Sequence, residues 1–291
     1  STEAERLTEP FFLTEPEVAS SCAVFSSPHS GDAYPKPFLQ STRLKGRAIR
    51  SSEDAFVADL FAVAPDFGAP LLAAKLPRAY VDLNRGEDEL DPALIAGVHR
   101  QGSNPRIVAG LGVIPRVVSE GRAIRDGKLS LAEARARLRE GYYPYHAKLT
   151  ALLETQRERH GEAVLFDCHS MPNDALSSAP MVRGKRPNII LGDRFGSSCG
   201  RWLMDAASEV FTSHGFVVAR NAPFAGGYIT QFYGRPSRNV HALQVEIDRG
   251  LYMDEQRLVR SDDFDHVVER LTQVVAGLTL IRSTGLPLAA E

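Results

Sequence analysis

A stretch near the middle of the chain, Val164–Pro172 (VLFDCHSMP), turns abruptly from apolar residues to chemically active ones. Asp167 and His169 contribute a carboxylate and an imidazole there, and His29 follows another apolar run in the stretch SPHSGD. Two imidazoles, one carboxylate and an open fourth position are a common ligand set of catalytic zinc. An acid near His29 would complete that set, so these residues predict a zinc site.

Glu246 lies between Val245 and Ile247 and adds a further carboxylate. Zinc lowers the pKa of a bound water to about 7 and polarises a carbonyl, and a separate carboxylate then serves as general base. We expect Glu246 to be that base. Each of these residues taken singly has an ordinary structural explanation, such as a buried ion pair for Glu246, so the prediction depends on their falling together at strand ends.

Other chemistries find less support in the same stretches. Asp167 next to Cys168 opposes thiolate formation, and strand alternation points the Cys168 side chain away from His169. Ser170 lacks the GxSxG pattern of a nucleophile elbow. The sequence has neither a Walker loop nor a GxGxxG fingerprint, so nucleotide binding is not indicated.

The elements that would position these groups alternate between strands and long helices. Strand patterns occur at 22–27, at 163–170, at 188–193, at 216–220 and at 240–248, with two further pieces around Pro77. Helical patterns occur at 51–68, at 130–161, at 197–215 and at 254–280, and Ser130 with Glu133 forms a capping box. This alternation predicts an α/β fold with a mostly parallel sheet, whose functional groups gather at the carboxyl ends of the strands.

Length and composition exclude several classes of function. The chain has 291 residues, 24% of them charged, with a formal net charge of -2, so nothing recruits nucleic acid or an anionic membrane. Its three cysteines are widely spaced, which suits a reducing compartment. The N-terminal residues are polar, and no apolar run reaches membrane-spanning length. We expect a cytoplasmic protein with a single domain over 1–291, and no feature indicates an oligomeric state.

Six stretches, in order along almost the whole chain, resemble the N-formylglutamate amidohydrolase family. They are SPHSG at 27–31, SEDAFVADLF at 52–61, AYVDLNR at 79–85, LFDCHSMP at 165–172, FAGGYITQFYG at 224–234 and HALQVEID at 241–248. The family is related to zinc carboxypeptidases and aspartoacylases. The resemblance therefore implies a three-layer α/β/α sandwich around a mostly parallel mixed sheet, like that of a zinc carboxypeptidase.

The resemblance also implies roles for particular residues. His29 and His169 match metal-binding histidines, and Glu246 matches the catalytic glutamate. An acid at the position of Asp54 belongs to the family pattern, so we favour Asp54 as the third ligand of one zinc ion per chain. Asp32 is the alternative, because His29-x-x-Asp32 imitates the His-x-x-Glu spacing of carboxypeptidases. Asp167 would orient a ligand imidazole.

The substrate contacts follow from the same resemblance. The DLNR motif is similar to one in which Asn and Arg hold a substrate carboxylate, a role that falls on Asn84 and Arg85 here. The glycine pair Gly226 and Gly227 would let the backbone approach the substrate, although a simple turn also explains it. Two weaker candidates for a second carboxylate are Arg116 and Arg235.

The expected activity is zinc-dependent hydrolysis of the amide of an N-formyl or N-acyl amino acid such as N-formylglutamate, a small carboxylate substrate. The chain differs from the histidine-degradation members in having Ala225 and Tyr228 beside the glycine pair, which could change the acid accepted. One alternative is a zinc carboxypeptidase or amidase that acts on a peptide or peptidoglycan fragment. Another is a non-catalytic protein that binds a small anion.

Overall fold

The computed structural model describes residues 9–99, 102 and 104–283. The chain forms two compact units that interleave along the sequence. Unit 1 comprises Ser1–Phe12, Pro28–Ala55 and Ala73–Leu149, and unit 2 comprises Leu13–Ser27, Phe56–Leu72 and Thr150–Glu291. The single domain over 1–291 stays a prediction. The polar N-terminal segment 1–8, in which no leader was expected, lies outside the described residues.

The strands of the main sheet are β1 (Phe11–Thr14), β2 (Ala23–Ser27), β3 (Leu71–Ala74), β4 (Ala163–Met171), β5 (Ile189–Gly192), β6 (Val218–Arg220) and β7 (Val240–Asp248). Their spatial order is β1-β3-β2-β4-β7-β5-β6. The pairs β2–β4, β4–β7 and β5–β6 are parallel, whereas β5 and β7 are antiparallel. The predicted mixed, mostly parallel sheet is therefore confirmed. A short hairpin, β8 (Met253–Asp254) with β9 (Val259–Arg260), lies outside it.

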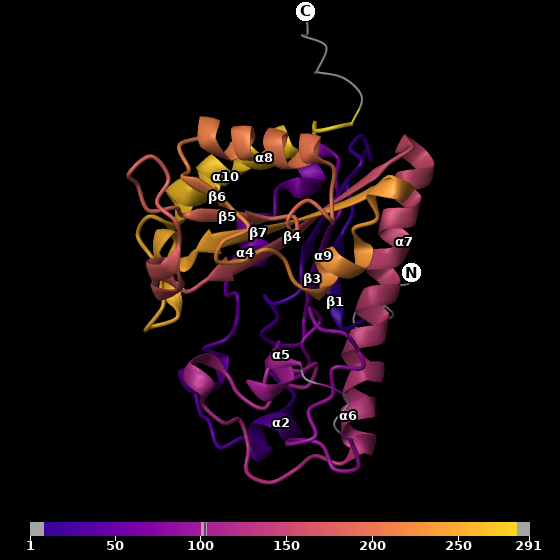
Figure 1. Cartoon of the computed structure of the whole chain (residues 1–291), viewed down its shortest axis with the longest axis vertical. Coiled ribbons are helices and arrows are strands. Elements are labelled where there is room, and N and C mark those ends of the chain that lie inside the picture. The colour runs from indigo at the N-terminus through magenta and orange to yellow at the C-terminus, as the bar shows by residue number, and fades with distance from the viewer. Residues whose placement is uncertain (1–8, 100–101, 103, 284–291) are drawn as a thin grey trace, which may run out of the picture. The chain divides into compact units, whose positions relative to one another are not determined.

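The α-helices are α2 (Lys36–Ser41), α3 (Arg47–Arg50), α4 (Val57–Leu60), α5 (Pro105–Val108), α6 (Leu131–Arg137), α7 (Tyr143–His160), α8 (Arg201–Ser213), α9 (Tyr228–Tyr233) and α10 (Phe264–Leu278). Short turns of 3-10 helix are η1 (Ala64–Phe67), η2 (Ser119–Gly121), η4 (Asn173–Ser178), η5 (Pro236–Arg238) and η6 (Arg249–Leu251). In unit 2, α8 and α10 pack together along one face of the sheet, and α9 contacts β7 (Figure 1). No helix of the described residues is long and apolar enough to cross a membrane.

The predicted helix over 130–161 is confirmed with an interruption. Ser130 and Glu133 form the expected capping box at the start of α6. A π-helical turn, η3 (Leu138–Tyr142), then separates α6 from α7. Pro144 lies at the start of α7, and because proline has no N–H and its ring crowds the carbonyl four residues earlier, the regular α-helical pattern is broken in the turn before it.

Three sequence predictions were wrong in detail. The expected helix over 254–280 begins only at Phe264, because the residues before it form the β8–β9 hairpin. The expected helix over 51–68 is only α4 and η1, because Phe56 has a left-handed backbone (φ 65°) just before α4 begins. The stretch after Pro77, expected as a strand, is a series of turns in which Asp82 caps the backbone N–H of Asn84 at 2.9 Å. The long irregular segment expected after residue 86 is confirmed, apart from α5 and η2, where the structure describes it.

Candidate functional site

The carboxyl end of the central strands in unit 2 carries the residues that the sequence singled out. β4 and β7 are parallel neighbours, and their register pairs His169 with Glu246 and Asp167 with Gln244. All four side chains are buried. Residues paired in this way on adjacent strands point to the same face of the sheet, so the imidazole and the carboxylate predicted for catalysis share one face of the sheet.

His169 is oriented by a carboxylate on its own strand. Its Nε2 lies 2.8 Å from Oδ2 of Asp167, two residues earlier and on the same face of β4. An ionised carboxylate only accepts hydrogen bonds, so Nε2 carries the proton and Nδ1 carries the lone pair that can bind a metal. This is the orienting role predicted for Asp167.

His29 has an equivalent carboxylate partner, which the sequence did not reveal. It follows the end of β2 by two residues, and its Nε2 lies 2.6 Å from Oδ1 of Asp82. Burial by itself would raise the pKa of Asp82, but His29, Arg85 and Arg78 together hold that pKa well below its usual value. Asp82 is therefore ionised and accepts the Nε2 proton, which again leaves the Nδ1 lone pair for a metal.

Asp54 approaches the same imidazole from the other side. Its Oδ2 lies 3.5 Å from Nδ1 of His29, and its backbone N–H donates to the His29 carbonyl at 3.0 Å. The preceding residue, Glu53, is buried and receives three hydrogen bonds from Arg50, at 2.8, 2.9 and 3.2 Å, and one from Tyr34 at 2.8 Å. These contacts fix the backbone that carries Asp54.

His29, Asp54 and His169 form a group that could hold a metal ion. Each is buried and offers one ligand atom, and these atoms all lie within 4.8 Å of one another. Two imidazoles and a carboxylate fit zinc, which accepts nitrogen and oxygen ligands and keeps a fourth position open in catalytic sites. Asp32, the alternative carboxylate, is exposed and does not belong to this group.

Arg85 is held tightly within unit 1. Its Nε donates to the carbonyl of Leu111 and one Nη1 hydrogen to that of Asn84, both at 2.8 Å, while Nη2 lies 3.9 Å from Asp82. Burial lowers the pKa of Arg85, and the charge of Asp82 opposes this change. Arginine has five N–H donors, more than these two hydrogen bonds use.

The two other arginines considered for a substrate carboxylate have different surroundings. Arg116 donates from Nε to Asp91 at 2.8 Å and so forms a structural ion pair. Arg235 is exposed, and its Nη1 donates to the carbonyls of Gln231 at 2.5 Å and Gly234 at 2.8 Å. Neither arrangement favours a role in binding substrate.

The glycine pair precedes α9 and has a conformational reason for its composition. Gly226 has φ 121°, and a Cβ built there would lie 2.5 Å from Oγ1 of Thr230. The backbone N–H of Gly227 donates to the side-chain oxygen of Gln244 at 2.9 Å. The pair therefore allows the backbone to pack closely onto β7, the strand that carries Glu246.

Neither the thiol of Cys168 nor the hydroxyl of Ser170 is suited to nucleophilic attack. Burial, and then the charge of Asp167, raise the pKa of Cys168 well above its usual value. Ser170 accepts a hydrogen bond from Nε of Arg249 at 3.0 Å, on the opposite face of β4 from His169. These contacts favour the metal-based chemistry over a covalent one.

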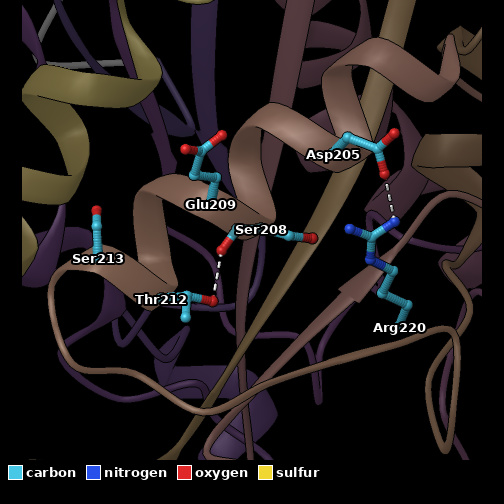
Figure 2. A pocket seen from close by; sticks show the side chains of 6 residues that line it. All are labelled: Asp205, Ser208, Glu209, Thr212, Ser213 and Arg220. Atoms are coloured by element: carbon cyan, nitrogen blue, oxygen red, sulfur yellow. Dashed lines mark hydrogen bonds and ion pairs between the residues drawn. The ribbon is translucent and has the colours of Figure 1, made fainter.

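A hollow on the surface of α8 is chemically unlike this site. Figure 2 shows Asp205 paired with Arg220, at 2.6 Å, and the hydroxyl of Thr212 bonded to the Ser208 carbonyl, at 2.7 Å. Its other lining residues are Glu209 and Ser213, and Ser208 also bonds to its own helix. Because these polar groups mainly satisfy one another, the hollow is a feature of the helix surface.

Comparison with known proteins supports the motif-based resemblance. The sequence matches the N-formylglutamate amidohydrolase family over residues 21–253. An N-formylglutamate deformylase of Pseudomonas putida is 32% identical over 236 residues, covering 80% of this chain and 82% of that protein. One of Pseudomonas aeruginosa is 32% identical over 237 residues, with the same coverage of both.

A solved structure agrees with the sequence comparisons. The crystal structure of N-formylglutamate amidohydrolase from Ralstonia eutropha JMP134 superposes with a TM-score of 0.85 at 35% identity, covering 92% of this chain and 96% of that one. The resemblance that the six motifs predicted is confirmed.

Proposed function

Because the chain belongs to the N-formylglutamate amidohydrolase family, we propose that it hydrolyses the amide of N-formylglutamate or a closely related N-acyl amino acid, releasing formate or another acid and the free amino acid. The observation that carries the proposal is the match to N-formylglutamate deformylases over four fifths of the chain. The buried groups around His29 and His169 support it, because they contain the residue types that such a hydrolysis needs.

The proposed cofactor is one zinc ion per chain, held by His29, Asp54 and His169. When bound, zinc would supply Lewis-acid polarisation of the amide carbonyl and a water of lowered pKa. The donor chemistry supports this assignment, and so do the carboxylate partners of both imidazoles, Asp82 and Asp167, which bond to Nε2 and leave Nδ1 as the nitrogen that would bind the metal.

Glu246 is the proposed general base and proton carrier. It would accept a proton from the attacking water and deliver it to the nitrogen of the departing amino acid. Its support is its position on β7, in register with His169 on β4 and buried from bulk solvent. A buried carboxylate competes with little solvent for the proton that it transfers.

Arg85 and Asn84 are proposed to bind the α-carboxylate of the substrate, and the backbone at Gly226 and Gly227 to border the substrate. Arg85 can grip a carboxylate through two parallel hydrogen bonds, which a lysine cannot do. We further propose that the enzyme works in the cytoplasm, since Cys22, Cys168 and Cys199 are all free thiols.

The test combines metal content with hydrolysis of defined substrates. Wild-type protein should contain about one zinc per chain and release formate from N-formylglutamate, and His169→Ala should lose both. Glu246→Gln should keep its zinc and lose at least ~100-fold in kcat, the usual scale of general-base catalysis. Turnover of a peptide or peptidoglycan fragment without release of formate would identify a different amidase, and binding of a small anion without any hydrolysis would refute the enzymatic proposal.

A further inference from the structure

Gln244 is a buried amide on the same face of β7 as Glu246. Its Nε2 lies 3.2 Å from Oε1 of Glu246, two residues along the strand. Its Oε1 accepts the backbone N–H of Gly227 at 2.9 Å. The side chain thus links the glycine pair before α9 to the proposed general base.

The orientation of this amide follows from its partners. A backbone N–H can only donate, so the carbonyl oxygen of Gln244 must face Gly227, and the NH2 group must face Glu246. A donor directed at one carboxylate oxygen stabilises the ionised carboxylate, which is the form that a general base needs.

The far end of this link is itself anchored. Arg194 donates from Nη1 to the carbonyl of Gly226 at 3.0 Å, and its backbone N–H donates to the carbonyl of Ala225 at 2.7 Å. The backbone that holds the Gln244 oxygen is therefore attached to the segment after β5. A fixed acceptor partner at one end gives the amide a defined direction at the other.

We propose that Gln244 is the positioning residue of Glu246: its NH2 group bonds to one carboxylate oxygen and holds the carboxylate in one rotamer. The inference rests on the proposed hydrolysis for its catalytic consequence. The geometry that carries it, from Gly227 through Gln244 to Glu246, lies entirely within unit 2. Gln244 is not expected to contact the substrate.

A kinetic experiment tests the catalytic consequence. Gln244→Met keeps the approximate volume and removes both hydrogen bonds, so kcat for N-formylglutamate should fall ~10- to 100-fold, the range for a hydrogen bond to a charged group. KM should change less than kcat, because the proposed carboxylate contacts of Arg85 and Asn84 are not altered. The matched control is Gln156→Met, another buried glutamine, which donates to the Ala23 carbonyl at 3.1 Å and should leave kcat unchanged.

A second variant and a structural readout keep the inference testable if the first variant is unstable. Gln244→Glu keeps the acceptor for Gly227 and removes the amide donor, so its kcat should fall at least as far. Crystal structures of the zinc-loaded wild type and of either variant should show Glu246 in a changed or mixed rotamer only in the variant. An unchanged kcat in a folded variant, or an unchanged Glu246 rotamer, would overturn the inference. The rotamer decides it even if N-formylglutamate proves not to be the substrate.

Discussion

Replacing Asp82 by asparagine tests whether His29 is a metal ligand oriented by its carboxylate partner. Asp82 accepts from His29 Nε2 at 2.6 Å, from Arg78 Nη2 at 2.9 Å and from the backbone N–H of Asn84 at 2.9 Å. In Asp82→Asn the oxygen can still accept from His29 and Asn84, but the charge is lost. The new NH2 group then faces Arg78, so a donor opposes a donor.

The size of the effect follows from these contacts. Loss of a charged partner behind a ligand histidine typically weakens metal binding ~10- to 100-fold, which corresponds to about 1.4 to 2.7 kcal/mol. Losing the charge that Arg78 faces should also lower the free energy of unfolding of the metal-free protein by about 1 to 3 kcal/mol. The two quantities are separable, because zinc affinity is measured where both proteins are folded.

The assay is competition for zinc with a chromophoric chelator at pH 7.5, with folding checked by circular dichroism. Asp205→Asn is the matched control, since Asp205 also pairs with an arginine, Arg220, at 2.6 Å but on the surface of α8. It should leave zinc affinity unchanged and cost at most ~1 kcal/mol of stability. A folded Asp82→Asn protein that binds zinc as tightly as the control would refute the assignment of His29 as an oriented ligand.

Three further predictions concern the substrate, the glycine pair and pH. Arg85→Ala should raise KM for N-formylglutamate ~10- to 100-fold and leave an N-formyl amino-acid amide unaffected; equal losses would indicate a structural role. Gly226→Ala should lower the free energy of unfolding by about 1 to 3 kcal/mol, because its Cβ would meet Thr230. The control is Gly184→Ala, whose Cβ would have nothing within 4 Å. Its free energy of unfolding should fall by less than that of Gly226→Ala in the same urea titration. Burial lowers the pKa of His241, so its contribution to stability is complete above about pH 6.5 and is lost as pH falls; urea unfolding of His241→Asn should therefore depend less on pH between 7.5 and 5.5, and an equal dependence would contradict this.

Strands β4 and β7 were predictable from the sequence because both satisfy one physical requirement. Central strands of a parallel sheet are buried on both faces, so they appear as near-continuous apolar runs. In both strands that run is followed by ionisable residues, which a buried strand tolerates only when they are paired. The positions of His169 and Glu246 in the sequence alone therefore placed them near the carboxyl ends of these central strands.

The region around Asp54 was harder to predict, because the apolar spacing of its sequence indicates a helix whereas its backbone is irregular. Apolar spacing from Phe56 onward is helical, but the backbone N–H of Asp54 donates to His29 and the left-handed Phe56 separates Asp54 from α4. The favoured third ligand thus lies in an irregular segment, where local propensity gives no position. The family pattern, and not periodicity, identified Asp54.

The two imidazoles show why part of the site could be predicted and part could not. Asp167 lies two residues before His169, so strand alternation alone brings their side chains to one face. Asp82 lies 53 residues after His29, in a series of turns, and no periodic pattern connects them. Yet both carboxylates bond to Nε2 and impose the same tautomer. If that tautomer is what a metal requires, asparagine at either position should weaken zinc binding by a similar factor, although only one of the two pairs can be recognised in the sequence.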